Sequence, residues 1–203
     1  NIIMNIVVLA GGLSTERDVS LNTGAMVSKA LRSKGHNVIM LDVFMGYHDQ
    51  EEDITGIFER AEEASAEGTQ IPGEAPDIAQ VKAMRKDQSD CFFGPNVIKI
   101  CQAADVVFMA LHGENGENGK IQAAFDLFGI QYTGSRYLGS ALAMDKGISK
   151  KMFEAAGIPT PHGISMSKAQ RGVPFAKTGL SLPCVVKPCC GGSSIGVTIV
   201  RTA

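Results

Sequence analysis

The chain has 203 residues, of which 44% are hydrophobic and 20% charged, and its formal net charge is -2. This is the composition of a globular protein with a substantial core. A charge so close to zero gives no long-range field to attract nucleic acid or an anionic membrane. The apolar runs are far shorter than the ~18 to 20 residues that cross a bilayer, and no signal peptide opens the sequence. We therefore expect a cytoplasmic protein that binds neither nucleic acid nor membranes.

The cysteine and histidine content argues against a disulfide framework or a metal centre. The cysteines do not show the paired spacings of a zinc site, and the chain holds only four histidines. The five cysteines are Cys91, Cys101, Cys184, Cys189 and Cys190. We expect reduced thiols and no metal ligands within this chain.

The beginning of the chain alternates between strand and helix patterns. The β-branched run 5–10 predicts a buried strand that ends at two glycines. Apolar side chains at helical spacing predict a helix over 20–34, with Ser20 available as its N-cap and Gly35 in the left-handed position that closes it. A second apolar run predicts a strand over 37–44.

The segment 46–94 has a different texture. An acidic stretch at 49–67 is followed by a turn-rich stretch and by a short basic helix pattern around 81–86. Because runs of charge are usually solvated, we expect an exposed insertion of helix and loop.

Regular alternation resumes after the insertion and predicts an α/β fold with a mostly parallel sheet. The expected elements are a helix over 94–104 started by Pro95, a strand over 105–111, a helix over 119–129 with Ile121, Phe125 and Phe128 on one face, and a strand over 130–134. In such a sheet, ligands gather beyond the carboxyl ends of the strands. The unusual residues of this sequence follow those ends.

The first strand end reads "AGGLSTERDVS". It lacks the G-x-G-x-x-G fingerprint, which disfavours a plain dinucleotide site. A polar cluster, Ser14 to Asp18, is expected at the mouth of the sheet, where a carboxylate such as Glu16 could hold an ammonium group. The alternative is a capped loop with solvated charges.

The second strand end reads "LHGENGENGK". Its three glycines permit tight turns and close backbone approach. The acidic and amide positions do not match an EF-hand, and one histidine does not make a zinc site. Taken alone, His112 is more often a structural histidine bonded to backbone.

A domain boundary is expected near Met144, after a helix-like run at 137–143. The next segment carries Lys146 and leads, through a turn bracketed by prolines, to a strand pattern at 182–188 that delivers Lys187.

The loop "CCGGSSIG" follows that strand. Its glycines and serines offer backbone N–H and hydroxyl donors beside an ammonium group, which is the chemistry of phosphate binding. It is not a Walker A loop, because the lysine precedes the glycines. A plain hairpin loop is the alternative.

Four segments together resemble the D-alanine–D-alanine ligase family of the ATP-grasp superfamily. They are "GGLSTERDVSLNTG", "ALHGENGENGKIQ", "YTGSRYLGSALAMDK" and "VVKPCCGGSSIGV". The resemblance implies a Rossmann-like N-terminal substrate domain over 1–143, with 46–94 as an insertion, and the start of an incomplete ATP-grasp central subdomain over 144–203. It also implies ATP-dependent ligation of two D-alanines, through a D-alanyl phosphate, for peptidoglycan synthesis.

The resemblance also implies roles for individual residues. Glu16 matches the glutamate that holds the ammonium of the first D-alanine, and His112 the histidine near its carboxylate. Lys146 and Lys187 match the lysines that bind nucleotide phosphates. Ser193 matches a serine linked by hydrogen bonding to Glu16 and to a mobile loop. Gly191, Gly192 and Ser194 would belong to the loop that covers the phosphates.

Two features of the chain depart from the family pattern. Cys189 and Cys190 stand where many relatives carry charged or polar residues, and Gly191 stands where glutamate is common. The resemblance implies ATP and Mg²⁺ as cofactors. The sequence ends before the family's adenine pocket, oxyanion arginine and magnesium carboxylates, so we expect no turnover by residues 1–203 alone.

Several readings remain open beside D-alanine–D-alanine ligation. D-lactate or D-serine could be the second substrate of a ligase of the same family. Another ATP-grasp ligase, such as a relative of glutathione synthetase, shares the lysines and the glycine loop, and a non-catalytic Rossmann-type module that binds a small molecule is also possible. A homodimer is expected from the resemblance.

Overall fold

The computed structural model describes residues 2–47, 54–61, 65–68, 74–192, 194 and 196–202. Ser193 and most of the acidic positions between 49 and 67 lie outside the described residues.

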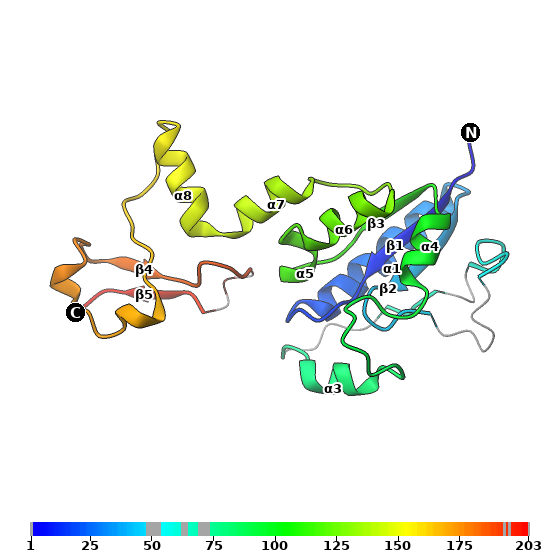
Figure 1. The fold of residues 1–203 in the computed structure, drawn as a ribbon, viewed down its shortest axis with the longest axis horizontal. Coiled ribbons are helices and arrows are strands. Elements are labelled where there is room, and N and C mark those ends of the chain that lie inside the picture. Colours follow the sequence, from blue (N-terminus) through cyan, green and yellow to red (C-terminus); the bar gives the residue numbers. More distant parts are fainter. Residues whose placement is uncertain are drawn as a thin grey trace.

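A parallel sheet forms the centre of the N-terminal part (Figure 1). Its strands are β1 (Asn5–Ala10), β2 (Asn37–Asp42) and β3 (Val106–Met109), in the order β2-β1-β3. All pairings are parallel, which confirms the predicted α/β fold. The strand expected over 130–134 forms one parallel bridge, between Val107 and Tyr132.

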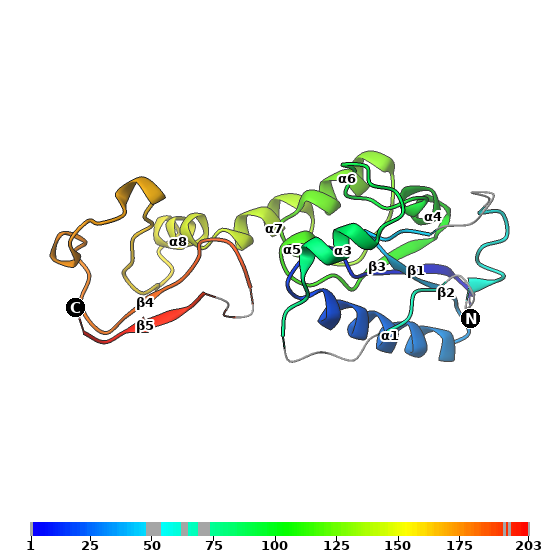
Figure 2. The same ribbon diagram turned by 90° about the horizontal axis from the view of Figure 1, so that it is seen from below.

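Alternating side chains of the strands fill two apolar layers. Ile6, Val8 and Ala10 pack on the face of the sheet that α1 (Arg17–Ser33) covers. Val7 and Leu9 point to the opposite face, under α4 (Val97–Ala103) and α6 (Lys120–Phe128) (Figure 2). The period of two follows from the strand pleat, and burial on both faces explains why the strands read as continuous apolar runs.

The helix α1 begins three residues before the predicted position, so Ser20 is not its N-cap. The turn starts where the backbone N–H of Arg17 donates to the carbonyl of Ser14, at 3.1 Å. The Ser20 side chain is fully buried and joins two strand ends: it accepts from the N–H of Gly11 at 3.0 Å and donates to the carbonyl of Ala110 at 2.7 Å. At the other end, the predicted left-handed glycine is confirmed, because Gly35 has φ +88°.

Two expectations about the later helices were wrong. Pro95 does not start α4, because Asn96 adopts a left-handed conformation (φ 62°) as the N-cap and the helix begins at Val97. Phe128 is 47% exposed, unlike Phe125, because it is the last residue of α6; beyond Gly129 it is Ile130 that enters the core.

The segment 46–94 is not simply an exposed insertion. Ile57 and Phe58 belong to the core under α4 and α6, and Val81 is buried on α3 (Ile78–Met84). These three apolar side chains therefore add to the buried part of the N-terminal region, which the charged composition of the segment did not indicate.

A buried arginine organises the end of that segment. The Arg85 guanidinium is 4.3 Å from the ring centroid of Phe44 and also donates to its carbonyl. It donates as well to the carbonyls of Asp87, Ser89 and Cys91, at 2.7 to 2.8 Å. The arginine thus donates hydrogen bonds to backbone carbonyls of an irregular stretch that forms no helix or sheet.

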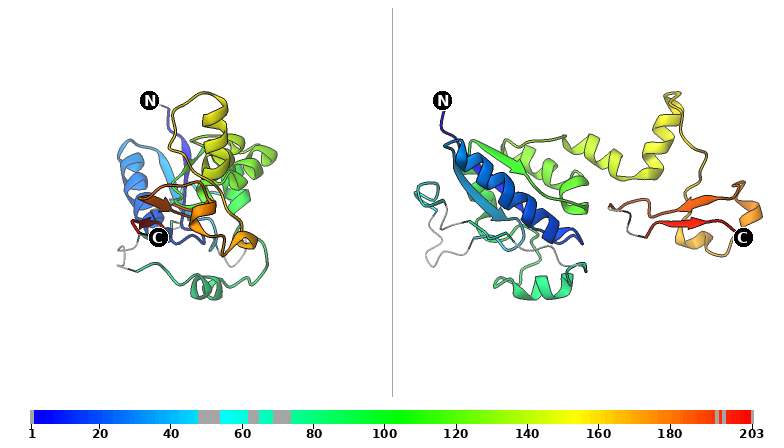
Figure 3. Two further views of the ribbon diagram at one scale, coloured as in Figure 1. Left: turned by 90° about the vertical axis from the view of Figure 1, so that its left-hand side faces the viewer. Right: turned by 180° about the vertical axis from the view of Figure 1, so that it is seen from behind.

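The C-terminal part consists of short helices and an antiparallel hairpin and extends away from the sheet (Figure 3). Its elements are α7 (Tyr137–Met144), α8 (Lys146–Ala155), η1 (Lys168–Gln170), η2 (Phe175–Lys177), β4 (Cys184–Val186) and β5 (Thr198–Val200). Asp145 lies between α7 and α8, next to the position predicted for the domain boundary. No described residue after Ile130 is buried. None of the described helices is both long and apolar enough to cross a membrane.

Candidate functional site

The loops that follow β1 and β3 are tied together at the carboxyl edge of the sheet. The N–H of Leu13 donates to Oδ1 of Asn115 at 2.7 Å. The Ser14 hydroxyl donates to the carbonyl of His112 at 2.8 Å and accepts from the N–H of Glu16 at 3.1 Å. One serine therefore links the backbone positions of the two residues expected to contact the first amino acid.

A buried ion pair stabilises the loop between β1 and α1. Arg17 pairs with Asp42, at the end of β2, and donates to the carbonyl of Gly12 at 2.8 Å. Arg17 is only 8% exposed, so within the predicted polar cluster its side chain pairs with the protein rather than with solvent. A β-carbon at Gly11 would lie 2.5 Å from a carboxylate oxygen of Asp42. Close packing against Asp42 thus requires glycine there.

The Glu16 side chain lies over the second loop. Gly113 has φ +76°, and a β-carbon on it would lie 2.8 Å from Oε2 of Glu16. Glycine therefore leaves the space that the carboxylate uses. The second loop continues into the one-turn helix α5 (Glu114–Glu117).

The glycine loop after β4 approaches this carboxylate from the C-terminal part. A β-carbon on Gly192 would lie 3.2 Å from Oε2 of Glu16 and 3.9 Å from Oε2 of Glu117. In Figure 1 the loop between β4 and β5 points back toward α5. Ser193 lies outside the described residues, so its hydrogen bond to Glu16 stays a prediction. Sequence reasoning did not single out Glu117, which follows His112 in the same glycine-rich motif.

Lys146 joins the start of α8 to the glycine loop. Its backbone N–H donates to the carbonyl of Cys189 at 2.9 Å, and its Nζ donates to the carbonyl of Gly191 at 2.8 Å. The predicted phosphate-binding residues, apart from Ser193, line one cavity of about 250 Å³. Its lining consists of Lys146, Lys187, Pro188, Gly191, Gly192, Ser194 and Val197.

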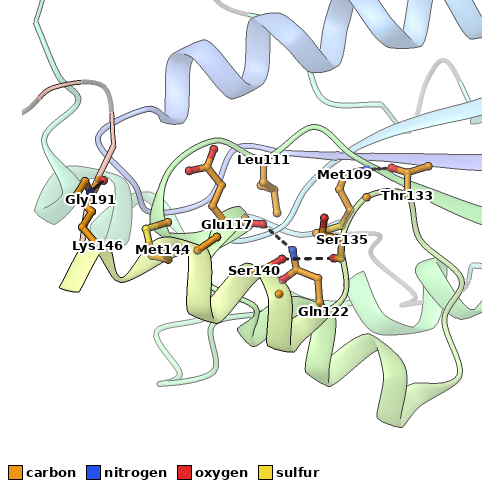
Figure 4. Close-up of a pocket in the computed structure, with 14 residues that line it drawn as sticks. Met109, Leu111, Glu117, Gln122, Thr133, Ser135, Ser140, Met144, Lys146 and Gly191 are labelled. Atoms are coloured by element: carbon orange, nitrogen blue, oxygen red, sulfur yellow. Dashed lines mark hydrogen bonds between the residues drawn. The ribbon is translucent and has the colours of Figure 1, made fainter. Parts of the chain in front are cut away.

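A larger cavity of about 490 Å³ shares Lys146 and Gly191 with the first and extends to the end of β3 (Figure 4). Glu117 stands between its two ends in that view, and Gln122 donates from Nε2 to the carbonyl of Gly116 at 2.7 Å. The two cavities therefore adjoin the same two residues, Lys146 and Gly191, of which Lys146 carries an ammonium group.

The arrangement has groups suited to a small zwitterion and to an anionic phosphate chain, but Glu16 and His112 line neither of the two cavities. Glu16 offers a carboxylate for an ammonium group, while Lys146 and Lys187 offer positive charge beside a loop rich in N–H donors. Group transfer between two such ligands needs them to lie close together.

Comparison with known proteins identifies relatives of the whole chain. Residues 5–135 match the family described as D-ala D-ala ligase N-terminus. The D-alanine–D-alanine ligase of Lacticaseibacillus casei (strain BL23) is 43% identical over 198 residues, which are 98% of this chain and 54% of that protein. This chain thus spans about half the length of the curated relatives it matches.

Solved structures agree with this similarity. The D-alanine–D-alanine ligase of Bacillus anthracis complexed with ATP matches with a TM-score of 0.62 and 28% identity, over 100% of this chain and 50% of that one. The VanG D-Ala:D-Ser ligase of Enterococcus faecalis matches with a TM-score of 0.63 and 26% identity, over 100% and 57%.

Proposed function

We propose that this chain, because it belongs to the D-alanine–D-alanine ligase family, forms the N-terminal half of an ATP-dependent ligase that makes D-alanyl-D-alanine for peptidoglycan. The observation that supports this most directly is the approach of Gly192 to the Glu16 carboxylate. It brings a loop suited to phosphate next to a group suited to the ammonium of an amino acid. We further propose that the substrate domain covers 1–143 and the nucleotide-binding part begins at 144.

In the first step, the Glu16 carboxylate accepts hydrogen bonds from the ammonium of the first D-alanine, and His112 lies near its carboxylate. A carboxylate oxygen attacks the γ-phosphorus of ATP, ADP leaves, and D-alanyl phosphate forms. Lys146 and Lys187 offset the repulsion between the two anions, and this electrostatic support is the main contribution that a protein makes to phosphoryl transfer.

The glycine loop has two tasks in this proposal. Backbone N–H groups of Gly191, Gly192 and Ser194 donate to phosphate oxygens, and contact of Ser193 with Glu16 closes the loop over the intermediate. Closure protects the acyl phosphate, because water would otherwise hydrolyse it.

In the second step, the amine of the second D-alanine attacks the carbonyl carbon of the acyl phosphate. The C–N bond forms, inorganic phosphate leaves, and the amine loses a proton. Similarity to a D-Ala:D-Ser ligase makes D-serine the second candidate for this position, and D-lactate is a third.

We also propose that the enzyme uses Mg²⁺ with ATP, works in the cytoplasm and forms a homodimer. Within the described ranges, no group of three or more His, Cys, Asp or Glu side chains could hold a metal ion.

The test is D-alanine-dependent release of phosphate from ATP by the complete gene product, with D-serine and D-lactate as competing second substrates. Glu16→Gln should raise the KM for the first D-alanine about ten- to hundredfold, because a charged contact is lost, while the KM for ATP stays unchanged. Lys187→Ala should weaken ATP binding by a similar factor.

The matched controls are Glu154→Gln and Lys151→Ala, which alter exposed side chains of α8. Both should behave as the wild type. Absence of phosphate release with D-alanine and each second substrate would refute the proposed function.

A further inference from the structure

The imidazole of His112 is held at one nitrogen by a residue of α1. Its Nε2 lies 3.0 Å from Oγ1 of Thr23, a contact between residues 89 positions apart. The hydroxyl of Ser14 holds the backbone carbonyl of His112 at the same time. Both ends of the histidine are therefore fixed by the β1–α1 segment. His112 is half-buried, and among the residues that the structure describes no hydrogen bond reaches its Nδ1.

We propose that Thr23 is a positioning residue whose hydroxyl donates to Nε2 of His112 and so keeps the proton of the neutral ring on Nδ1. This inference rests on the proposed function, in which His112 lies near the carboxylate of the first amino acid. A carboxylate can only accept hydrogen bonds, so the nitrogen that meets it must carry a proton. A neutral imidazole has one donor and one acceptor, and the partner of one nitrogen decides the state of the other.

The side chain of Thr23 suits this task. Its contact with His112 is its one side-chain hydrogen bond within the described part of the chain. The hydroxyl proton is therefore available to Nε2. Thr23 lies about two helical turns after Glu16, which is the N-cap of α1, so the first half of one helix orients both residues expected to hold the amino acid.

The kinetic test compares Thr23→Val, which keeps the shape but removes the donor, with Thr23→Ser, which keeps the hydroxyl. Thr23→Val should raise the KM for the first D-alanine about two- to tenfold, the value of one hydrogen bond, and leave the KM for ATP unchanged. Thr23→Ser should stay close to the wild type. Thr202→Val, at an exposed threonine, is the matched control. Equal effects of the valine and serine variants would overturn the inference.

A second measurement reads the ring directly and needs no activity. In the ligand-free complete protein, ¹⁵N NMR of the imidazoles distinguishes the two neutral tautomers, and His112→Gln assigns the signal. Nδ1–H should dominate in the wild type and lose population in Thr23→Val. An Nε2–H ring in the wild type, or a ring unchanged by Thr23→Val, would disprove the role of Thr23. If the protein used no D-alanine but showed the expected tautomer, the proposed function would fail while the Thr23 contact stood.

Discussion

Gly11 shows how one residue beneath the site is constrained by two independent requirements. Its φ of +79° lies in the left-handed region, and a β-carbon would meet the buried Asp42 carboxylate at 2.5 Å. Gly35 has a similar φ of +88°, but no atom lies within 4 Å of its β-carbon position. The two glycines therefore separate the cost of backbone conformation from the cost of a steric clash.

Gly11→Ala should lower the free energy of unfolding by about 3 kcal/mol or more, because left-handed strain and displacement of the Arg17–Asp42 pair add together. Gly35→Ala should cost only the conformational part, about 1 to 2 kcal/mol. Urea denaturation of both variants gives the comparison. Equal losses would mean that Asp42 moves aside at no cost.

Cys101 is a buried thiol, 1% exposed, and burial raises its pKa to about 12. The unfolded thiol ionises at a lower pH, near the ordinary cysteine pKa of 9.0, so the folded form binds the proton more tightly. Its contribution to stability is therefore complete below about pH 9 and is lost as the pH rises toward about 12.

Cys101→Val should remove this alkaline loss, so the difference in stability between the variant and the wild type should grow in favour of the variant from pH 9 upward. Thermal unfolding at several pH values measures it.

Iodoacetamide should alkylate the exposed Cys189 and Cys190 of the native protein and leave Cys101 unmodified. Rapid alkylation of Cys101 below pH 9 would contradict its burial.

At the scale of elements, Arg85 connects α3 and the stretch that follows to the core. Arg85→Met should keep much of the packing over Phe44 but leave the carbonyls of Asp87, Ser89 and Cys91 without their donor. We expect a loss of about 1 to 3 kcal/mol, because the buried carbonyl of Phe44 also loses its donor. Arg171→Met, at an exposed site, is the control. Denaturation with parallel limited proteolysis of residues 85–93 tests this, and similar stabilities of the two variants would count against the buried network.

The strands β1 and β3 and the loops that follow them show which elements can be predicted from the sequence. The β-branched runs and the glycines after them predicted both strands and both loops, since strand period and turn chemistry are local properties. The start of α1 was misplaced because Ser20, a good N-cap by type, is used as a tertiary link between Gly11 and Ala110 instead. A contact across 90 residues leaves no local signal.

At the scale of the molecule, the two parts differ in burial. The N-terminal sheet contains side chains that are fully buried, such as Val7 and Ile39, whereas no described residue after Ile130 is buried. Exposed apolar side chains gather on the hairpin, among them Val185, Val186 and Ile199. In residues 1–203, the β4–β5 hairpin therefore buries much less apolar surface than the N-terminal sheet, so its free energy of local opening should be lower.

Hydrogen exchange of the 203-residue polypeptide should reveal this difference. Amides of β1 and β2 should exchange at the rate of global unfolding, and those of β4 and β5 should exchange orders of magnitude faster through local opening. Mass spectrometry of the exchanged chain measures both. Equal protection of the two sheets would show that the hairpin is supported by contacts that its burial does not reveal.

The sequence by itself determined the alternating α/β fold, the two glycine-rich loops at strand ends and the family to which they belong. These features depend on local periodicity and on residue types that only certain turns accept. Tertiary structure alone decided that Arg17 is buried against Asp42, that Thr23 holds the ring of His112, and that Gly192 reaches Glu16. Each of these joins segments distant in the chain, and such contacts depend on how helices and loops pack rather than on any pattern within one segment.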